Sequence, residues 1–388
     1  MTGCRNGAWA LGLALWLATT CAQAQERGPL TLAKASYFFV GGKIETSAEG
    51  SPTVGHMYVE YMIPARQRHP YPIVMVHGGS QTGTNFTGTP DGREGWAQYF
   101  VRRGYAVYVV DQVARGRSAH WSQLHGPVQP PRFNFAEQRF IAPERFKQWP
   151  QAHLHTQWPG TGHAGDPAFD QFYASQFPSI VSFPKQQELN RDALVALFDK
   201  IGPAILLTHS QSGAFGWPVA DARSNLVKAL VQVEPNGPPV HNVENVAGPE
   251  WFKDAGAAKL SGLGDVPLTY EPPLAAGARL EFVRQEKPDG DGLVRCWRQQ
   301  EPARKLPNLA RIPVVIVMAE ASYHAAYDHC TAAYLEQAGV RNTLVRLADV
   351  GVRGNGHMMM IEKNNVSTAG VIAQWLDRQR LREKQAGR

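Results

Sequence analysis

The fold of this chain is decided by one short stretch, Thr208-His209-Ser210-Gln211-Ser212-Gly213. The apolar run 204–207 comes directly before it, and a run compatible with a helix begins at Ala214. The sequence therefore predicts a buried strand, a sharp turn that carries a central serine, and then a helix. Such a turn lifts one serine Oγ above the edge of a sheet, where the N-terminus of the helix stabilises negative charge.

This arrangement is a nucleophile elbow, whose usual pattern is G-x-S-x-G. With Ser210 as the nucleophile, Thr208 and Ser212 stand where glycines are usual; with Ser212, the residues there are Ser210 and Ala214. All of them are small enough for a tight turn, and Ser210 is the better candidate. Taken alone, the stretch is equally compatible with an ordinary strand–helix turn, so the rest of the chain must decide.

Outside this stretch, short apolar runs alternate with helical patterns. The alternation predicts an α/β fold with a mostly parallel sheet and helices on both faces. Together with the nucleophile elbow, this sheet is expected to have the α/β-hydrolase architecture. Strands are expected at 37–40, 56–63, 73–76, 106–110, 204–207, 229–233, 313–318 and 343–347. Helices are expected at 92–103, 186–201, 327–338 and 365–380.

Two stretches interrupt the alternation, at about 119–185 and about 236–311. The first is rich in Pro, Gln, His and aromatic residues, and a structureless loop of that length would be unusual inside a compact domain. We expect it to be an insertion that folds over the site as a lid or cap. Its aromatic residues favour an apolar or aromatic pocket.

The first 24 residues have the features of a secretory signal peptide, with Arg5 in the positive region and an apolar region at 8–20. Ala22-Gln23-Ala24 is a typical cleavage site, so the domain is expected to span 25–388 after a cut following Ala24. This predicts a secreted or periplasmic protein. No later segment is apolar enough for a membrane span.

Charge and cysteine content narrow the class further. The net charge is +6, and the basic residues are dispersed except in 378–388, which also contains acidic residues, so no nucleic-acid or membrane partner is indicated. Cleavage leaves two cysteines, Cys296 and Cys330. In an oxidising compartment such a pair is expected to form a disulfide, the alternative being two free buried thiols.

A serine nucleophile needs a general base, and the base needs a carboxylate that orients it. His357 lies in a glycine-rich loop after the last strand and before the last helix, which is the place of the base in this fold. We expect it to titrate near its usual pKa of ~6.5. Position alone leaves three candidates for the carboxylate, namely Glu234 after one strand and Glu320 or Asp328 after the next.

An oxyanion hole needs two backbone N–H groups that point at one oxygen. Gln211, which follows the nucleophile, is one expected donor. The other is Gly79, because His77-Gly78-Gly79 follows the strand at 73–76 and resembles the HGG-type loop of lipases and esterases.

Four groups of residues occur together in this chain: SQSG at 210–213, TPDGR at 89–93, DQ at 111–112 with RGRS at 115–118, and GNGHM at 354–358. In this combination the chain resembles a secreted bacterial esterase subfamily of the α/β-hydrolases, with an SHSQSG elbow and a Ser-Glu-His triad. The resemblance covers roughly residues 36–380. It implies that Ser210 is the nucleophile, His357 the base and Glu234 the acid. It also implies carboxylic-ester hydrolysis without a cofactor.

One departure from the subfamily lies in the oxyanion loop. Its best-described member has two adjacent cysteines there, whereas this chain has Gly79-Ser80. The backbone donor is retained, but the rigidity of the loop and the range of substrates do not carry over.

The prediction is thus a secreted serine esterase that acts on a small-molecule ester through an acyl-enzyme. A lactonase or acyltransferase on the same triad, or a non-catalytic binding protein, are the alternatives. No metal site is expected, because neither His153 with His155 nor Asp289 with Asp291 has the spacing of one. The sequence leaves the oligomeric state open and is compatible with a homodimer.

Overall fold

The structure is a computed structural model of the 388-residue chain and describes residues 28–46, 50–246, 251–275 and 278–381. The chain divides into two compact units, Met1–Leu30 and Thr31–Arg388, and every element below belongs to the second. The expected signal peptide, residues 1–24, lies outside the described residues. None of the described helices is both long and apolar enough to cross a bilayer.

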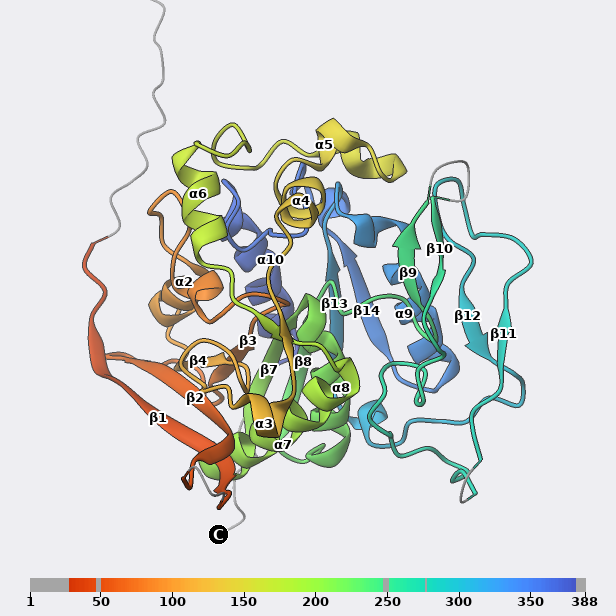
Figure 1. The fold of residues 1–388 in the computed structure, drawn as a ribbon, viewed down its shortest axis with the longest axis horizontal. Coiled ribbons are helices and arrows are strands. Elements are labelled where there is room, and N and C mark those ends of the chain that lie inside the picture. Colours follow the sequence, from red (N-terminus) through yellow and green to blue (C-terminus); the bar gives the residue numbers. More distant parts are fainter. Residues whose placement is uncertain (1–27, 47–49, 247–250, 276–277, 382–388) are drawn as a thin grey trace, which may run out of the picture. The chain divides into compact units, whose positions relative to one another are not determined.

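An eight-stranded sheet forms the centre of the second unit, in the order β1-β2-β4-β3-β7-β8-β13-β14 (Figure 1). β1 pairs antiparallel with β2 and β2 antiparallel with β4, while all the other neighbours are parallel. The predicted α/β-hydrolase fold is confirmed. The strands are β1 (Leu32–Ile44), β2 (Thr53–Pro64), β3 (Ile73–Val76), β4 (Val107–Asp111), β7 (Ala204–His209), β8 (Val227–Val233), β13 (Val314–Met318) and β14 (Asn342–Arg346).

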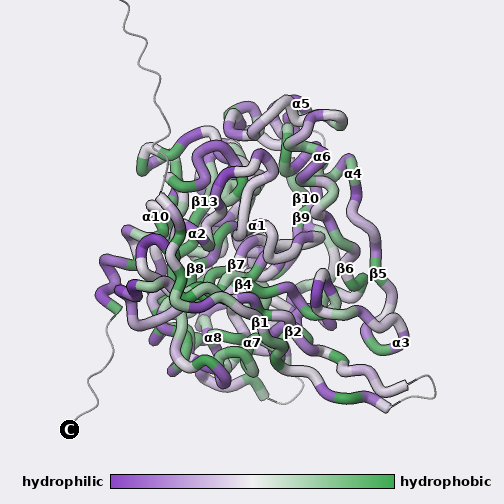
Figure 2. Tube along the Cα trace, turned by 90° about the vertical axis from the view of Figure 1, so that its left-hand side faces the viewer, coloured by the Kyte–Doolittle hydropathy of each residue, from purple (hydrophilic) through white to green (hydrophobic). Residues whose placement is uncertain are grey.

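Both faces of the sheet are covered because its central strands are apolar on both sides. Every residue of β3, β7 and β13 is buried. One face packs in a shared core with α7 (Phe183–Ile201), α8 (Gly213–Ala222) and α9 (Asp328–Gln337). Much of the trace at β7, β8 and α8 is coloured hydrophobic in Figure 2.

A second pair of helices, α2 (Trp96–Arg102) and α10 (Asn365–Arg378), packs together, and α2 contacts β2 and β4. The indole N–H of Trp96 donates to the carbonyl oxygen of Asn365 at 2.8 Å, which fixes α2 against the start of α10. Since α10 begins shortly after the loop that carries His357, this contact also fixes the loop.

The two irregular stretches contain short elements. Residues 119–185 form α3 (Ser122–His125), β5 (Val128–Gln129), α4 (Phe133–Ala136), the π-helical turn η1 (Glu137–Ile141), α5 (Pro143–Phe146), η2 (Pro150–Leu154), α6 (Pro167–Ala174) and β6 (Ser179–Ile180). Residues 236–311 form β9 (Asn242–Asn245), β10 (Phe252–Ala255), β11 (Phe282–Arg284), β12 (Trp297–Gln299) and η4 (Leu309–Arg311). The remaining short elements are α1 (Thr84–Thr87), η3 (Ser210–Ser212), η5 (Tyr323–Ala326) and η6 (Leu347–Val350).

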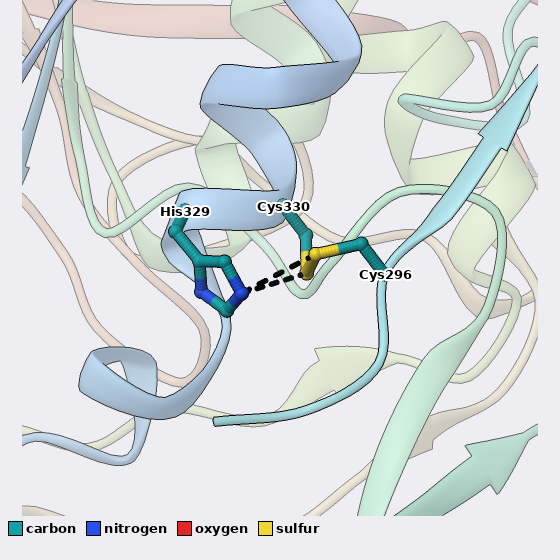
Figure 3. Close-up of side chains that lie close together, drawn as sticks. All are labelled: Cys296, His329 and Cys330. Carbon is teal, nitrogen blue, oxygen red and sulfur yellow. Dashed lines mark hydrogen bonds between the residues drawn. A yellow bond between two sulfur atoms is a disulfide. The ribbon is translucent and has the colours of Figure 1, made fainter. Parts of the chain in front are cut away.

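Cys296 and Cys330 form a disulfide, and His329 lies against it (Figure 3). The His329 Nε2 atom is 3.3 Å from the Cys296 sulfur and 3.6 Å from the Cys330 sulfur. The bridge joins the chain just before β12 to the first turn of α9. It therefore connects the second irregular stretch to a helix that packs against the central sheet.

Replacing both Cys296 and Cys330 by alanine is expected to lower the free energy of unfolding by roughly 3–4 kcal/mol, because the bridge closes a loop whose ends are 34 positions apart. Chemical denaturation of the wild type and the double variant measures this. Peptide mapping without reduction is the direct check. Two thiols that alkylate freely in the denatured, unreduced wild type would contradict the bridge.

Candidate active site

Ser210 and Ser212 lie in different environments, although they are two residues apart. Ser210 adopts a left-handed backbone conformation (φ 55°) and lines a cavity of about 450 Å³. Non-glycine residues with positive φ are uncommon and cluster at functional sites. Ser212 is fully buried; its hydroxyl accepts the His209 N–H at 2.9 Å and donates to the Val76 carbonyl oxygen at 2.8 Å. Ser210 is therefore the serine that a substrate can reach.

The elbow folds without the usual glycines at 208 and 212 because the closest approach to a neighbouring segment occurs at Gly213. A Cβ atom at Gly213 would lie 2.5 Å from the Cβ of Pro235, so this position requires glycine. Thr208 is instead buried and donates a hydrogen bond from its hydroxyl to Gln232. The polar groups at the substituted positions are thus hydrogen-bonded within the core.

The structure brings His357 and Glu234 together. The His357 Nδ1 atom donates to Glu234 Oε2 at 2.5 Å, and both side chains are buried. Glu234 also accepts the Ala319 N–H at 2.8 Å and the Ser322 hydroxyl at 2.7 Å. The other ring nitrogen of His357, Nε2, has no hydrogen-bond partner among the described residues.

The two other candidate carboxylates lie elsewhere. Glu320 accepts the Gly354 N–H at 2.8 Å and pairs with the guanidinium of Arg353 at 3.0 Å. Asp328 lies 2.8 Å from His324 Nδ1. Among the described residues, Glu234 is the carboxylate that contacts His357.

Burial is the largest influence on the pKa of each member of the His357–Glu234 pair. It lowers the pKa of His357 well below its usual range, and the positive charges that His209 and His324 can carry lower it further. Burial raises the pKa of Glu234, whereas the positive charge that His324 can carry and the hydrogen bonds from Ser322 and Ala319 lower it. The expected titration of His357 near its usual pKa is therefore wrong, because the ring is enclosed.

A second histidine, which sequence reasoning missed, lies beside this pair. The ring of His324 stacks on that of His357, with centroids 4.9 Å apart and planes at 9°. Burial lowers the pKa of His324 to about 4 and raises that of its partner Asp328. The four-residue spacing of His324 and Asp328 is the sequence signal that could have identified this pair.

Gly79 and Gln211, the two residues whose backbone N–H groups are expected to form the oxyanion hole, line the same cavity. Gln211 stands at the start of η3, where N–H groups lack intrahelical acceptors. A Cβ atom at Gly79 would lie 3.7 Å from the Gln211 side chain, so the two residues are adjacent. The Gly79 N–H donates to no backbone carbonyl among the described residues.

Arg115 anchors the loop that carries Gly79. Its buried guanidinium donates to the Gly78 carbonyl oxygen at 3.0 Å and to the Ser179 hydroxyl at 2.7 Å. Ser179 in turn accepts the Ser80 N–H at 3.3 Å. These contacts hold the loop at Gly79-Ser80 in place.

The cavity is more polar than the aromatic residues of 119–185 suggest. Phe135 and Phe140 of the first irregular stretch line it, as the aromatic content of 119–185 predicts. The lining also contains two arginines, five glutamines and two asparagines, so the expected apolar or aromatic pocket is only part of the surface. Phe140 packs on the His357 ring with centroids 5.2 Å apart, which shields this ring from water.

His155 joins the first irregular stretch to the loop of His357. Its ring lies 2.9 Å from Glu144 of α5 and 2.9 Å from Glu362. Glu362 also accepts the Gly356 N–H at 2.9 Å. Burial lowers the pKa of His155, but the hydrogen bonds to the two carboxylates outweigh it and raise the pKa to about 9.

We expect His155→Gln to lower the free energy of unfolding by about 3 kcal/mol near pH 6. The folded pKa of about 9 exceeds the unfolded value of ~6.5, so this stabilisation is complete below ~6.5 and is lost as the pH rises through about 9. Urea unfolding of wild type and variant at pH 6 and pH 9.5 measures the difference. An equal difference at both pH values would show that the ring is held unprotonated.

Potential metal ligands converge at two places among the described residues: Cys296, His329 and Cys330, and Glu234, His324 and His357. The two cysteines of the first group are joined in the disulfide. His153, Asp289 and Asp291 belong to neither group, and His155 is held between its two carboxylates.

Comparison with known proteins places the chain among esterases and lipases. No model of a known protein family matches it. The probable secreted lipase phiG of Fungal sp. (strain ATCC 74256) is 44% identical over 345 residues, which cover 89% of this chain and 90% of that protein. A solved structure described as a novel bacterial esterase is 26% identical, with a TM-score of 0.57, over 91% of this chain and 98% of that one. This chain belongs to the esterase and lipase family of the α/β-hydrolase fold.

Proposed function

We propose that this protein is a serine hydrolase that cleaves carboxylic esters through an acyl-enzyme intermediate. In this proposal Ser210 is the nucleophile, His357 the general base and Glu234 the group that orients the base. The backbone N–H groups of Gly79 and Gln211 stabilise the oxyanion. No resident metal or cofactor takes part.

The first half of the reaction forms the acyl-enzyme. The Ser210 Oγ attacks the ester carbonyl carbon while its proton moves to His357 Nε2, the nitrogen without a partner. Glu234 holds the Nδ1 proton and stabilises the imidazolium that forms. When the tetrahedral intermediate collapses, the C–O bond to the alcohol breaks and His357 returns the proton to the leaving oxygen.

The second half repeats these steps with water. His357 removes a proton from water as its oxygen attacks the acyl carbon, and the ester bond to Ser210 then breaks with return of the proton to Oγ. One ester and one water thus yield one carboxylic acid and one alcohol, and the enzyme is regenerated. The two N–H donors act on the negative charge that the carbonyl oxygen carries in both halves, commonly the largest single contribution in such sites.

The observation that carries this proposal is the 2.5 Å contact between Glu234 and His357, which lines the same cavity as Ser210. A binding protein has no need of a buried carboxylate that orients an otherwise unpaired imidazole. The names of the fungal lipase and the bacterial esterase support the same chemistry. The 26% identity of the bacterial esterase supports a relation to bacterial esterases.

We further propose that the protein is exported. The relative at 44% identity is named as secreted, and the pattern of residues 1–24 agrees with cleavage after Ala24. In this proposal residues 119–185 form the cover of the cavity, since Arg139 and Phe140 from this stretch line it.

Labelling with a fluorophosphonate probe tests the proposed mechanism directly, because the probe phosphonylates activated serines. We expect one equivalent of label on the peptide that contains Ser210, and no label in Ser210→Ala. Ser212→Ala is the matched control and should still be labelled. A protein that takes up no probe, or takes it up at another serine, would refute the proposal.

A further inference from the structure

The charges that face the cavity are of one sign. Its lining includes Arg132 and Arg139 but no aspartate, glutamate or lysine of the described residues. Glu234 lies behind His357 and is fully buried. A cavity lined by one sign of charge with low-dielectric walls raises the local concentration of ligands of opposite charge.

Arg139 has most of its hydrogen-bonding capacity free. It comes from the π-helical turn η1, a conformation that is frequent at functional sites. The guanidinium carbon lies 4.8 Å from the ring centroid of Phe135 and 5.0 Å from that of Tyr323. Asn245 is the one described residue that accepts a hydrogen bond from it, and no carboxylate of the described residues forms an ion pair with it. A guanidinium has five N–H donors, so four remain for a ligand.

The free donors lie next to the reacting centre. The Tyr323 ring, over which Arg139 sits, is 4.8 Å from the His357 ring, and both rings line the cavity together with Ser210. Burial is the largest cause of the lowered pKa of His357, and the charge of Arg139 adds to it. One aromatic ring therefore separates Arg139 from His357, the proposed base.

Resting on the proposed esterase function, we propose that the site selects esters with an ionised carboxylate a few bonds from the scissile carbonyl, and that Arg139 binds this carboxylate. A guanidinium matches a carboxylate with two parallel N–H···O bonds, the strongest pairing available to it. Arg132 adds positive charge at the cavity. Its guanidinium carbon lies 4.6 Å from the ring centroid of Phe135, the ring that Arg139 also contacts. Amide side chains such as Gln129 and Asn242 make the surrounding surface polar rather than lipid-like.

The test compares the hydrolysis of charged esters with that of neutral esters of the same shape. Hydrolysis is followed through the proton that it releases at pH 7.5. Monomethyl glutarate, with the carboxylate in the acyl part, is paired with methyl 5-methylhexanoate. 4-Acetoxybutanoate, with the carboxylate in the alcohol part, is paired with 4-methylpentyl acetate. We expect a ratio of kcat/KM, charged over neutral, of about tenfold or more in one pair, and the pair that shows it identifies the part that carries the carboxylate.

The variant Arg139→Gln should reduce that ratio to about one, because the fork is lost while hydrogen bonding to Asn245 is still available. Arg66→Gln is the matched control, since Arg66 is exposed, lies outside the cavity lining and carries the same charge. Its ratio should equal that of the wild type. Should Arg139→Gln fail to fold, Arg139→Lys keeps the charge without the fork and should lower the ratio to an intermediate value.

The outcomes separate this inference from the proposed function. A wild-type ratio of one or less in both pairs overturns the inference, and so does a ratio that Arg139→Gln leaves unchanged. If Ser210→Ala is inactive on the neutral esters in the same assay, the proposed function stands even then. If Ser210→Ala retains turnover, the proposed function itself fails and the inference falls with it.

Discussion

Ser210→Ala is expected to reduce kcat for a simple ester about a million-fold while the fold is retained. The members of a catalytic triad act as a unit, so loss of the nucleophile removes nearly all that the unit contributes. Ser210 is suited to such a test because it lines the cavity and its own side chain is not part of the core. Steady-state turnover of purified protein, with a thermal melt to verify folding, measures the effect.

The control for this change is Ser212→Ala. Ser212 is buried and joins the end of β3 to the elbow, so its loss should cost about 1–3 kcal/mol of stability through an unpaired buried group. Its effect on kcat should be far smaller than that of Ser210→Ala. A folded Ser210→Ala protein that keeps more than a few per cent of its turnover would exclude Ser210 as the nucleophile.

The centre of the sheet could be predicted because its central strands are apolar on both faces. The apolar run 73–76 coincides with β3, and the run 204–207 lies within β7, whose burial leaves no other position for such residues. The strands at the edge of the sheet were less well predicted. The pattern indicates a strand only at 37–40, whereas β1 extends over Leu32–Ile44. The longer strand forms because pairing with β2 stabilises residues that lie exposed. Local patterns do not record such pairing.

The residues of the candidate site likewise divide into those that the sequence indicates and those that it does not. Ser210, His357 and Gly79 were indicated by their places after particular strands, and a fold with parallel strands brings those ends together. Arg139 and His324 carried no such signal. Arg139 reaches the cavity through a π-helical turn in a stretch without periodicity, so its position depends on tertiary packing. His324 lies in a short turn, η5, and its four-residue spacing from Asp328 indicates that pair but not its place beside His357.

The choice of carboxylate gives the second large effect. Glu234→Gln is expected to lower kcat about 10⁴-fold, since the carboxylate both selects the tautomer of His357 and stabilises its charged form. The geometry explains the size of the effect. An amide oxygen at the place of Oε1 still accepts the Ala319 N–H, but its NH2 group then faces His357 Nδ1. The ring must accept there and carry its proton on Nε2, where it cannot act as a base.

Glu320→Gln is the matched control, because it makes the same chemical change at the carboxylate that position alone ranked equally. Glu320 pairs with an exposed arginine, Arg353, and such pairs contribute at most about 1 kcal/mol. We expect turnover within a few-fold of the wild type, measured on the same ester and with the same melting control. If Glu320→Gln were the damaging change and Glu234→Gln the mild one, the 2.5 Å contact between Glu234 and His357 would be structural, and the orienting acid would follow β13. Equal and large losses in two folded variants would instead mean that the loop held by Glu320 through the Gly354 N–H sets the position of His357.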